Sequence, residues 1–179
     1  MKKLLLMVLL TAGVGILPAS AQRHVKHLAA WGTHVGRSET GDYYELSYTP
    51  MLSDRLGLRL SGGYEHGTLP ARGEYSVYQG RVLLSPQLFR LGEVAYIHLL
   101  LGGGAGYEWT YQNGSGELPT GSGESQRFTY GPQAGLEADV FLGNRLSLVA
   151  TGTKGYLFNN PLIDRWPGMA SVGLRYHFR

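Results

Sequence analysis

The chain has 179 residues and no cysteine, and its 16 basic and 13 acidic residues give a formal net charge of +3. This length fits a single domain, the lack of cysteine excludes disulfides and thiolate metal sites, and the balanced charge gives no basis for an electrostatic grip on nucleic acid. Its 27 glycines, beside 12 tyrosines, indicate crowded backbone rather than disorder.

The N-terminus has the pattern of a secretory signal peptide. Two lysines follow the first methionine, an apolar run extends over Leu4–Leu17, and Pro18–Ala21 supplies small residues at a cleavage site. The run is too short for a stable transmembrane helix, which disfavours the alternative of an anchor helix. We therefore expect export through the Sec pathway, with cleavage between Ala21 and Gln22. Loss of the two lysines lowers the net charge from +3 to +1, since 3 − 2 = 1.

Period-two alternation of apolar and polar residues recurs through residues 22–179, the expected mature domain. Such alternation predicts β-strands with one apolar face. The apolar sets extend over residues 29–35, 44–48, 56–64, 78–84, 95–109, 128–140, 146–152 and 170–178. The opposite faces carry glycine, short polar side chains and a few charges of both signs. We expect an all-β fold of eight antiparallel strands in up-and-down order.

The connections between these segments are expected to alternate in length. Short turns are expected at Ser53-Asp54 and Gly143-Asn144, and longer connections over Gly67–Gly73, Gln112–Gln126 and Asn159–Pro167. Two connections depart from this pattern: Ser85–Glu93 is longer and Arg37–Asp42 is shorter. Outer-membrane barrels have short periplasmic turns and longer external loops, so we expect both termini in the periplasm.

A soluble barrel would alternate too, with its apolar face inward, so further features must decide. The polar face is rich in glycine and short side chains, as crowding inside eight strands requires. The last strand alternates up to Phe178, as outer-membrane proteins typically end, and a closed sheet pairs every backbone group in lipid. Aromatic residues gather near the expected outer ends of the strands, as in an interfacial belt. They are Tyr43, Tyr44, Tyr64, Tyr107, Trp109, Tyr111, Phe128, Tyr130, Tyr156 and Trp166. We therefore expect a transmembrane β-barrel in contact with the lipid of a Gram-negative outer membrane.

Charged residues on the polar face should neutralise one another inside the barrel. The up-and-down path places Arg59, Arg81, Glu137, Asp139 and Arg175 in the lower half of the lumen, with His98 and His177 nearby. The same path places Glu45, Glu65 and Glu108 nearer the outer mouth. Because buried charges without partners are costly, we expect the lower group to form an arginine–carboxylate network that plugs the lumen.

No motif points to catalysis, a cofactor or a metal, so we expect none of the three. Gly102–Gly106 superficially looks like a phosphate-binding loop, but it continues a strand and lacks the following Lys-Ser/Thr. Its glycines are better explained by crowding inside the barrel, and the six histidines show no metal-ligand spacing. An enzyme at the outer rim would have to use residues such as His66, Asp42, Ser125 and Asp164. None of these has a paired carboxylate or an oriented base.

Three runs carry a family resemblance. They are Gly103–Glu108, Gly143–Lys154 and Ala170–Phe178. Together with the signal peptide and the length, they resemble the TraO family of conjugative-transposon transfer proteins. The resemblance implies an outer-membrane part in DNA transfer between cells, with other conjugation proteins as partners, and it brings no catalytic residue with it.

The leading hypothesis is thus a non-enzymatic outer-membrane barrel that serves in a conjugative transfer apparatus. The alternative is a stand-alone surface barrel that acts in adhesion or envelope protection through its outer loops. An enzyme at the rim, acting on lipid or peptide, is the third hypothesis. Eight strands leave a lumen filled by side chains, so a general diffusion pore is not expected.

Overall fold

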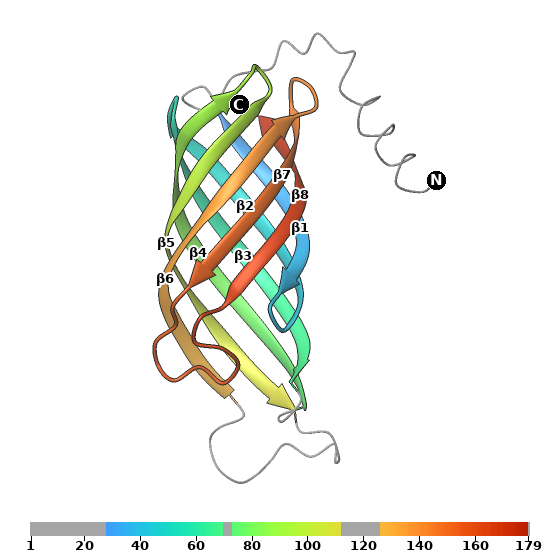
Figure 1. Ribbon diagram of the computed structural model, residues 1–179, viewed down its shortest axis with the longest axis vertical. Helices are drawn as coiled ribbons and strands as arrows, with labels where there is room; N and C mark the ends of the chain where they lie inside the picture. The colour runs from blue at the N-terminus through green and yellow to red at the C-terminus, as the bar shows by residue number, and fades with distance from the viewer. Residues whose placement is uncertain (1–27, 70–72, 112–125, 179) are drawn as a thin grey trace, which may run out of the picture.

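The protein folds as a closed barrel of eight antiparallel strands (Figure 1). The computed structural model describes residues 28–69, 73–111 and 126–178, so the expected cleavage between Ala21 and Gln22 lies outside the described residues. The strands are β1 (Ala29–Ser38), β2 (Gly41–Ser53), β3 (Leu56–Leu69), β4 (Gly73–Leu91), β5 (Ala95–Tyr111), β6 (Gln126–Phe141), β7 (Leu146–Gly155) and β8 (Gly168–Phe178). Each strand pairs with the next, and β8 pairs with β1, which confirms the expected fold.

The two faces of the wall differ as the alternation predicts. On β8, Val172 and Leu174 lie on the outside with 55% and 49% of their surface exposed, whereas Ser171 and Arg175, which flank them in sequence, are buried inside. The same alternation continues around the barrel, so the outer face is apolar, while the lumen is largely polar with a few buried apolar side chains such as Leu83, Leu100 and Val149. A closed, outward-apolar sheet suits a hydrocarbon surrounding, because each strand's backbone groups are paired within the wall.

Aromatic rings form contacts near both ends of the wall. One group joins Tyr64, Tyr78 and Trp109, with ring centroids 5.0 and 5.4 Å apart. At the opposite end, Trp31 lies 5.0 Å from Tyr48. Two such girdles at the two interfaces are typical of outer-membrane barrels. The placement of Tyr43 in the belt was wrong: it is 1% exposed and lies in the lumen, because its neighbour Tyr44 faces outward.

The connections define two ends of the barrel, which we call the turn end and the loop end. The turn end holds the β2–β3, β4–β5 and β6–β7 connections and the end of β8, and it is uppermost in Figure 1. The loop end holds the other connections, of which β1–β2 has only two residues between Ser38 and Gly41. Four strands have 14 to 19 residues, more than the 9–11 or so that a tilted strand needs to cross a bilayer, so they extend beyond it.

The expected connection Ser85–Glu93 was wrong in extent. Strand β4 continues to Leu91, and the turn is confined to residues 92–94, where Gly92 has a positive φ of 65°. A register shift between Gln87 and Phe89 changes the phase of the alternation within this segment. Such a bulge interrupts the period-two pattern without ending the strand.

The β7–β8 connection, residues 156–167, folds back against the wall at the loop end. The amides of Tyr156 and Phe158 donate to the carbonyls of Pro132 and Tyr130 on β6. Leu162, at the middle of the connection, is buried. This connection therefore covers part of the loop-end mouth rather than projecting away from it.

We expect an arginine on the middle of the outer face to destabilise the barrel far more than one at its edge. Val172→Arg, near the centre of the 11-residue β8, should cost about 2–4 kcal/mol of unfolding free energy, and Leu146→Arg, next to the β6–β7 turn, about 0–1 kcal/mol. Urea unfolding in lipid vesicles measures both. Equal, small losses for the two variants would mean that this face does not contact hydrocarbon.

Candidate functional site

Three arginines and three carboxylates meet inside the barrel, and we call them the lumen cluster (Arg59, Arg81, Arg175, Glu45, Glu137 and Asp139). Five strands supply them, namely β2, β3, β4, β6 and β8. Their side chains are at most 4% exposed. Alternation dictates this placement, since each residue occupies a lumen-facing position of its strand.

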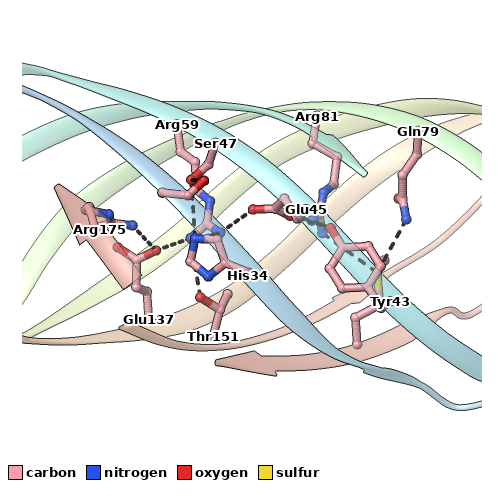
Figure 2. A network of polar contacts seen from close by, with 12 residues as sticks. His34, Tyr43, Glu45, Ser47, Arg59, Gln79, Arg81, Glu137, Thr151 and Arg175 are labelled. Atoms are coloured by element: carbon pink, nitrogen blue, oxygen red, sulfur yellow. Dashed lines mark hydrogen bonds and ion pairs between the residues drawn. The ribbon is translucent and has the colours of Figure 1, made fainter. Parts of the chain in front are cut away.

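The six groups form an alternating chain of charge (Figure 2). Glu45 pairs with both Arg81 and Arg59. Glu137 pairs with Arg59 and, at 2.7 Å, with Arg175. Arg175 ends the chain by donating to Asp139 at 2.9 Å. With three positive and three negative groups in contact, the cluster is neutral, and each charge has an opposite neighbour.

Uncharged side chains complete the hydrogen bonding of the cluster. Arg59 donates to Nε2 of His34 at 3.2 Å and to Oγ1 of Thr151 at 3.3 Å. A guanidinium has no acceptor, so His34 accepts at Nε2, which assigns its ring as neutral with the proton on Nδ1. Tyr43 accepts from Arg81 and donates to Glu45, so it lies between the two (Figure 2). His34 was not among the residues predicted to line the lumen, although it occupies a lumen-facing position of β1 in the period-two pattern.

The five residues expected in the network lie together, but Arg81 joins the group through a sixth residue, Glu45. Arg59, Glu137, Asp139 and Arg175 are in contact, but Arg81 reaches them only through Glu45. Glu45 lies nearer the outer mouth than Arg59, as expected, but it belongs to the network instead of standing apart from it. Glu45 faces Gly63 across the ladder, four residues from Arg59, and the long arginine side chain spans this offset along the tilted strands.

Other lumen residues lie on either side of the cluster. His177 lies toward the turn end, where it contacts Oγ of Ser147 at 3.0 Å and stacks on Phe141. Buried His98 is the ladder partner of Glu137. Glu65 and Glu108 lie toward the loop end, where they accept hydrogen bonds from Thr40 of the β1–β2 connection and from Leu162 of the β7–β8 connection.

Glycine on β5 makes room for the cluster. A Cβ added at Gly104 would lie 2.9 Å from Cγ of Arg81 and 3.0 Å from the carbonyl oxygen of Gly80. A larger residue would displace the arginine stem or the neighbouring strand. The Gly102–Gly106 run is thus part of a strand whose inward positions accommodate side chains from the adjacent wall, in agreement with the crowding interpretation.

The cluster packs as matched pairs of opposite charge. Charge-assisted hydrogen bonds between guanidinium and carboxylate groups are roughly twice as strong as neutral ones, so these pairs hold their side chains firmly in place. Replacing a buried ion pair by apolar groups can leave stability unchanged, but removal of one partner is costly. The cluster therefore joins strands across the lumen, and its charges depend on one another.

The residues considered for rim catalysis are engaged separately. Asp42 pairs with Arg37 at 3.4 Å, and Nδ1 of His66 lies 3.3 Å from Oγ of Ser76. Asp164 accepts from the amide of Trp166, and Ser125 lies outside the described residues. Asp42 and His66 lie opposite each other on β2 and β3, but within the described part of the chain no side-chain hydrogen bond joins any two of Asp42, His66 and Asp164.

Two kinds of feature are absent from the described residues. No helix there is long and apolar enough to cross a membrane. No group of three or more His, Cys, Asp or Glu residues there could hold a metal ion.

Comparison of the whole fold with solved structures finds several small barrels. The N-terminal β-barrel domain of OprF from Pseudomonas aeruginosa matches with a TM-score of 0.61, 12% identity, and coverage of 86% of this chain and 98% of that one. The fold is that of a small outer-membrane β-barrel. Neisserial surface protein A matches this barrel with a TM-score of 0.62 and 12% identity, over 84% of this chain and 96% of the other.

Ail, the attachment invasion locus protein of Yersinia pestis, also matches this barrel. Its TM-score is 0.56 at 16% identity, over 86% of this chain and all of Ail. No protein-family model matches the chain. No curated protein matches it either. At these identities the likeness shows the fold alone.

We expect the buried and exposed ion pairs to differ sharply in a double-mutant cycle. Arg59→Met alone should cost about 3–5 kcal/mol of unfolding free energy, because it leaves the cluster with an uncompensated negative charge. Adding Glu137→Gln should recover part of that loss. The matched control is the half-exposed pair Lys154–Glu39, whose cycle should give about 0.2–1 kcal/mol. Equal coupling energies in the two cycles would contradict the role assigned to the lumen cluster.

Proposed function

We propose that this chain is a non-enzymatic outer-membrane anchor protein that serves in a conjugative transfer apparatus. In this proposal, residues 1–21 are a signal peptide cleaved between Ala21 and Gln22 after export through the Sec pathway. The mature chain inserts with the turn end and both termini in the periplasm and the loop end outside. The apolar outer face and the two aromatic girdles support insertion in a membrane.

The observation that carries the anchor role is the neutral cluster across the lumen. Arg59 and Arg175 come from strands on different sides of the barrel and meet on Glu137. An eight-stranded interior is just wide enough for such side chains. A barrel filled in this way offers its partners its loops, its turns and its outer wall, rather than a passage for DNA or protein.

The transfer role is supported by the three runs that resemble the TraO family. Gly103–Glu108 lies in the loop-end half of β5, Gly143–Lys154 covers the β6–β7 turn and β7, and Ala170–Phe178 makes up nearly all of β8. The resemblance thus includes wall strands and the closing strand. The expected mature charge of +1 favours contacts with other transfer proteins over a direct grip on DNA.

A second candidate is adhesion or envelope protection through the loop end. The observation that favours it is the structural likeness to Ail, a protein named for attachment and invasion. In that case the barrel would act alone, and its external loops would be the active surface.

Deletion of the gene from a donor strain separates these two functions. We expect transfer of the conjugative element to fall to the background of a donor without the element, and a plasmid copy of the gene to restore it. Attachment to surfaces and survival under detergent stress, measured in the same strain, should be unchanged. Normal transfer with impaired attachment would replace the transfer role by the adhesion role.

We also expect the purified mature protein to form no steady conducting channel in a planar lipid bilayer. The reason is that side chains of the lumen cluster meet across the interior with at most 4% exposure. A 16-stranded porin, inserted in the same bilayer, is the positive control. Stable ohmic currents from this barrel would show that the lumen is open and would rule out a purely anchoring role.

A further inference from the structure

A small cavity lies at the loop end of the lumen, and we call it the loop-end chamber. Glu65 on β3, Glu108 on β5 and Gln133 on β6 line its walls, and Ile163 of the β7–β8 connection covers it. Its volume is about 40 Å³. A cavity needs roughly 10–15 Å³ on this measure to hold one water molecule, so the chamber has room for about three.

The walls of the chamber are acidic without compensation. Glu39, Glu65, Glu108 and Asp164 line it, whereas no lysine, arginine or histidine of the described residues does. Glu39 at the rim pairs with Lys154. Glu65 and Glu108 are only 6% and 2% exposed, and no described residue forms an ion pair with either. Buried carboxylates normally have a cationic partner.

Existing hydrogen bonds hold both carboxylates in place. Tyr75 and Ser38 donate to Glu65 at 2.7 and 2.6 Å. The amide of Leu162 donates to Glu108 at 2.6 Å. A carboxylate has about four acceptor sites, so each retains capacity for a further donor. These contacts orient the two groups but do not neutralise their charge.

Gln133 provides an independent sign of a missing donor. Its side chain is 95% buried, since only 5% of the residue is exposed, and it lines the same chamber. Its Oε1 atom has no hydrogen-bond partner among the described residues. A buried acceptor left in this way costs free energy unless a guest donates to it.

We propose that the loop-end chamber binds the primary ammonium end of a small linear amine. An ammonium has three N–H donors, and three acceptor side chains line the chamber, Glu65, Glu108 and Gln133. Val77, Leu157 and Ile163 form apolar wall on which a short alkyl stem can pack. The volume admits an ammonium with one or two carbons and excludes a sugar or a peptide.

A metal ion fits the chamber less well. Calcium takes six to eight oxygen ligands, and no group of three or more acidic or histidine side chains among the described residues has metal-binding geometry. A bare ion would also make no use of the apolar part of the wall, which offers it no ligand. The site lies apart from the lumen cluster, so it is independent of the proposed transfer role.

The experiment uses the refolded mature protein in detergent micelles, with ethylammonium chloride as the probe. The amide resonance of Leu162 reports on the site, because this amide donates to Glu108. We expect ethylammonium to shift it saturably. Tetramethylammonium has the same charge but no N–H donor, and should give no saturable shift at equal concentration. A saturable shift with tetramethylammonium, tighter binding of calcium chloride, or no saturation with ethylammonium would each overturn the proposal.

Variants locate the binding. Glu65→Gln and Glu108→Gln should each weaken ethylammonium binding by about tenfold or more, since each loses a charge-assisted hydrogen bond. The matched control is Asp42→Asn, an exposed carboxylate at the loop end that does not line the chamber, and it should bind like the parent protein. Unchanged affinity in folded Glu65→Gln and Glu108→Gln would overturn the site. If either fails to fold, as judged by its heat-dependent mobility in gels, the comparison of the two ammonium probes on the parent protein still decides.

Discussion

Closure of the sheet is the constraint on which the rest of this structure depends. Once β8 pairs with β1, every inward side chain shares one narrow interior, and none can turn to bulk water. Charge inside that interior must be balanced locally, because an unpaired buried ion is far more costly than a paired one. The lumen cluster meets this requirement with equal numbers of guanidinium and carboxylate groups.

The same constraint explains how much of the fold was visible in the sequence. A strand whose two faces meet hydrocarbon and a polar interior must alternate, so the alternation revealed the eight strands and the inward position of the arginines. It failed at Ser85–Glu93, because a bulge changes the phase of the pattern there. Tyr43 is aromatic like the belt residues, but alternation along β2 turns its side chain into the lumen, because the adjacent Tyr44 faces outward. Aromatic composition alone therefore misplaced it.

Partner choice inside the lumen could not be read from the sequence in the same way. Glu45 and Arg59 are not ladder partners, and their contact depends on strand tilt and on the reach of a long side chain. Counting residues along strands that run alternately up and down gives neither the strand tilt nor the reach of a side chain. The chamber was equally hidden, since it depends on Leu162 and its connection folding back over the mouth.

Charge is distributed unequally along the lumen. The lumen cluster is balanced, whereas the loop-end chamber has acidic groups and no basic side chain from the described residues. A balanced interior holds the wall together and leaves little for a ligand to recognise. An interior region with excess negative charge near a mouth of the barrel favours cations. Ligand binding inside this barrel is therefore expected at the loop end.

The position of Arg175 has a consequence for assembly. It lies on β8, the last strand of the chain, and it is the partner of both Glu137 and Asp139. A sheet that has formed through β7 therefore holds three lumen carboxylates against two guanidinium groups. The lumen cluster becomes neutral only when the final strand enters the gap between β7 and β1. The strand that closes the ring therefore also supplies the guanidinium that balances the cluster, so ring closure buries no unpaired cluster charge.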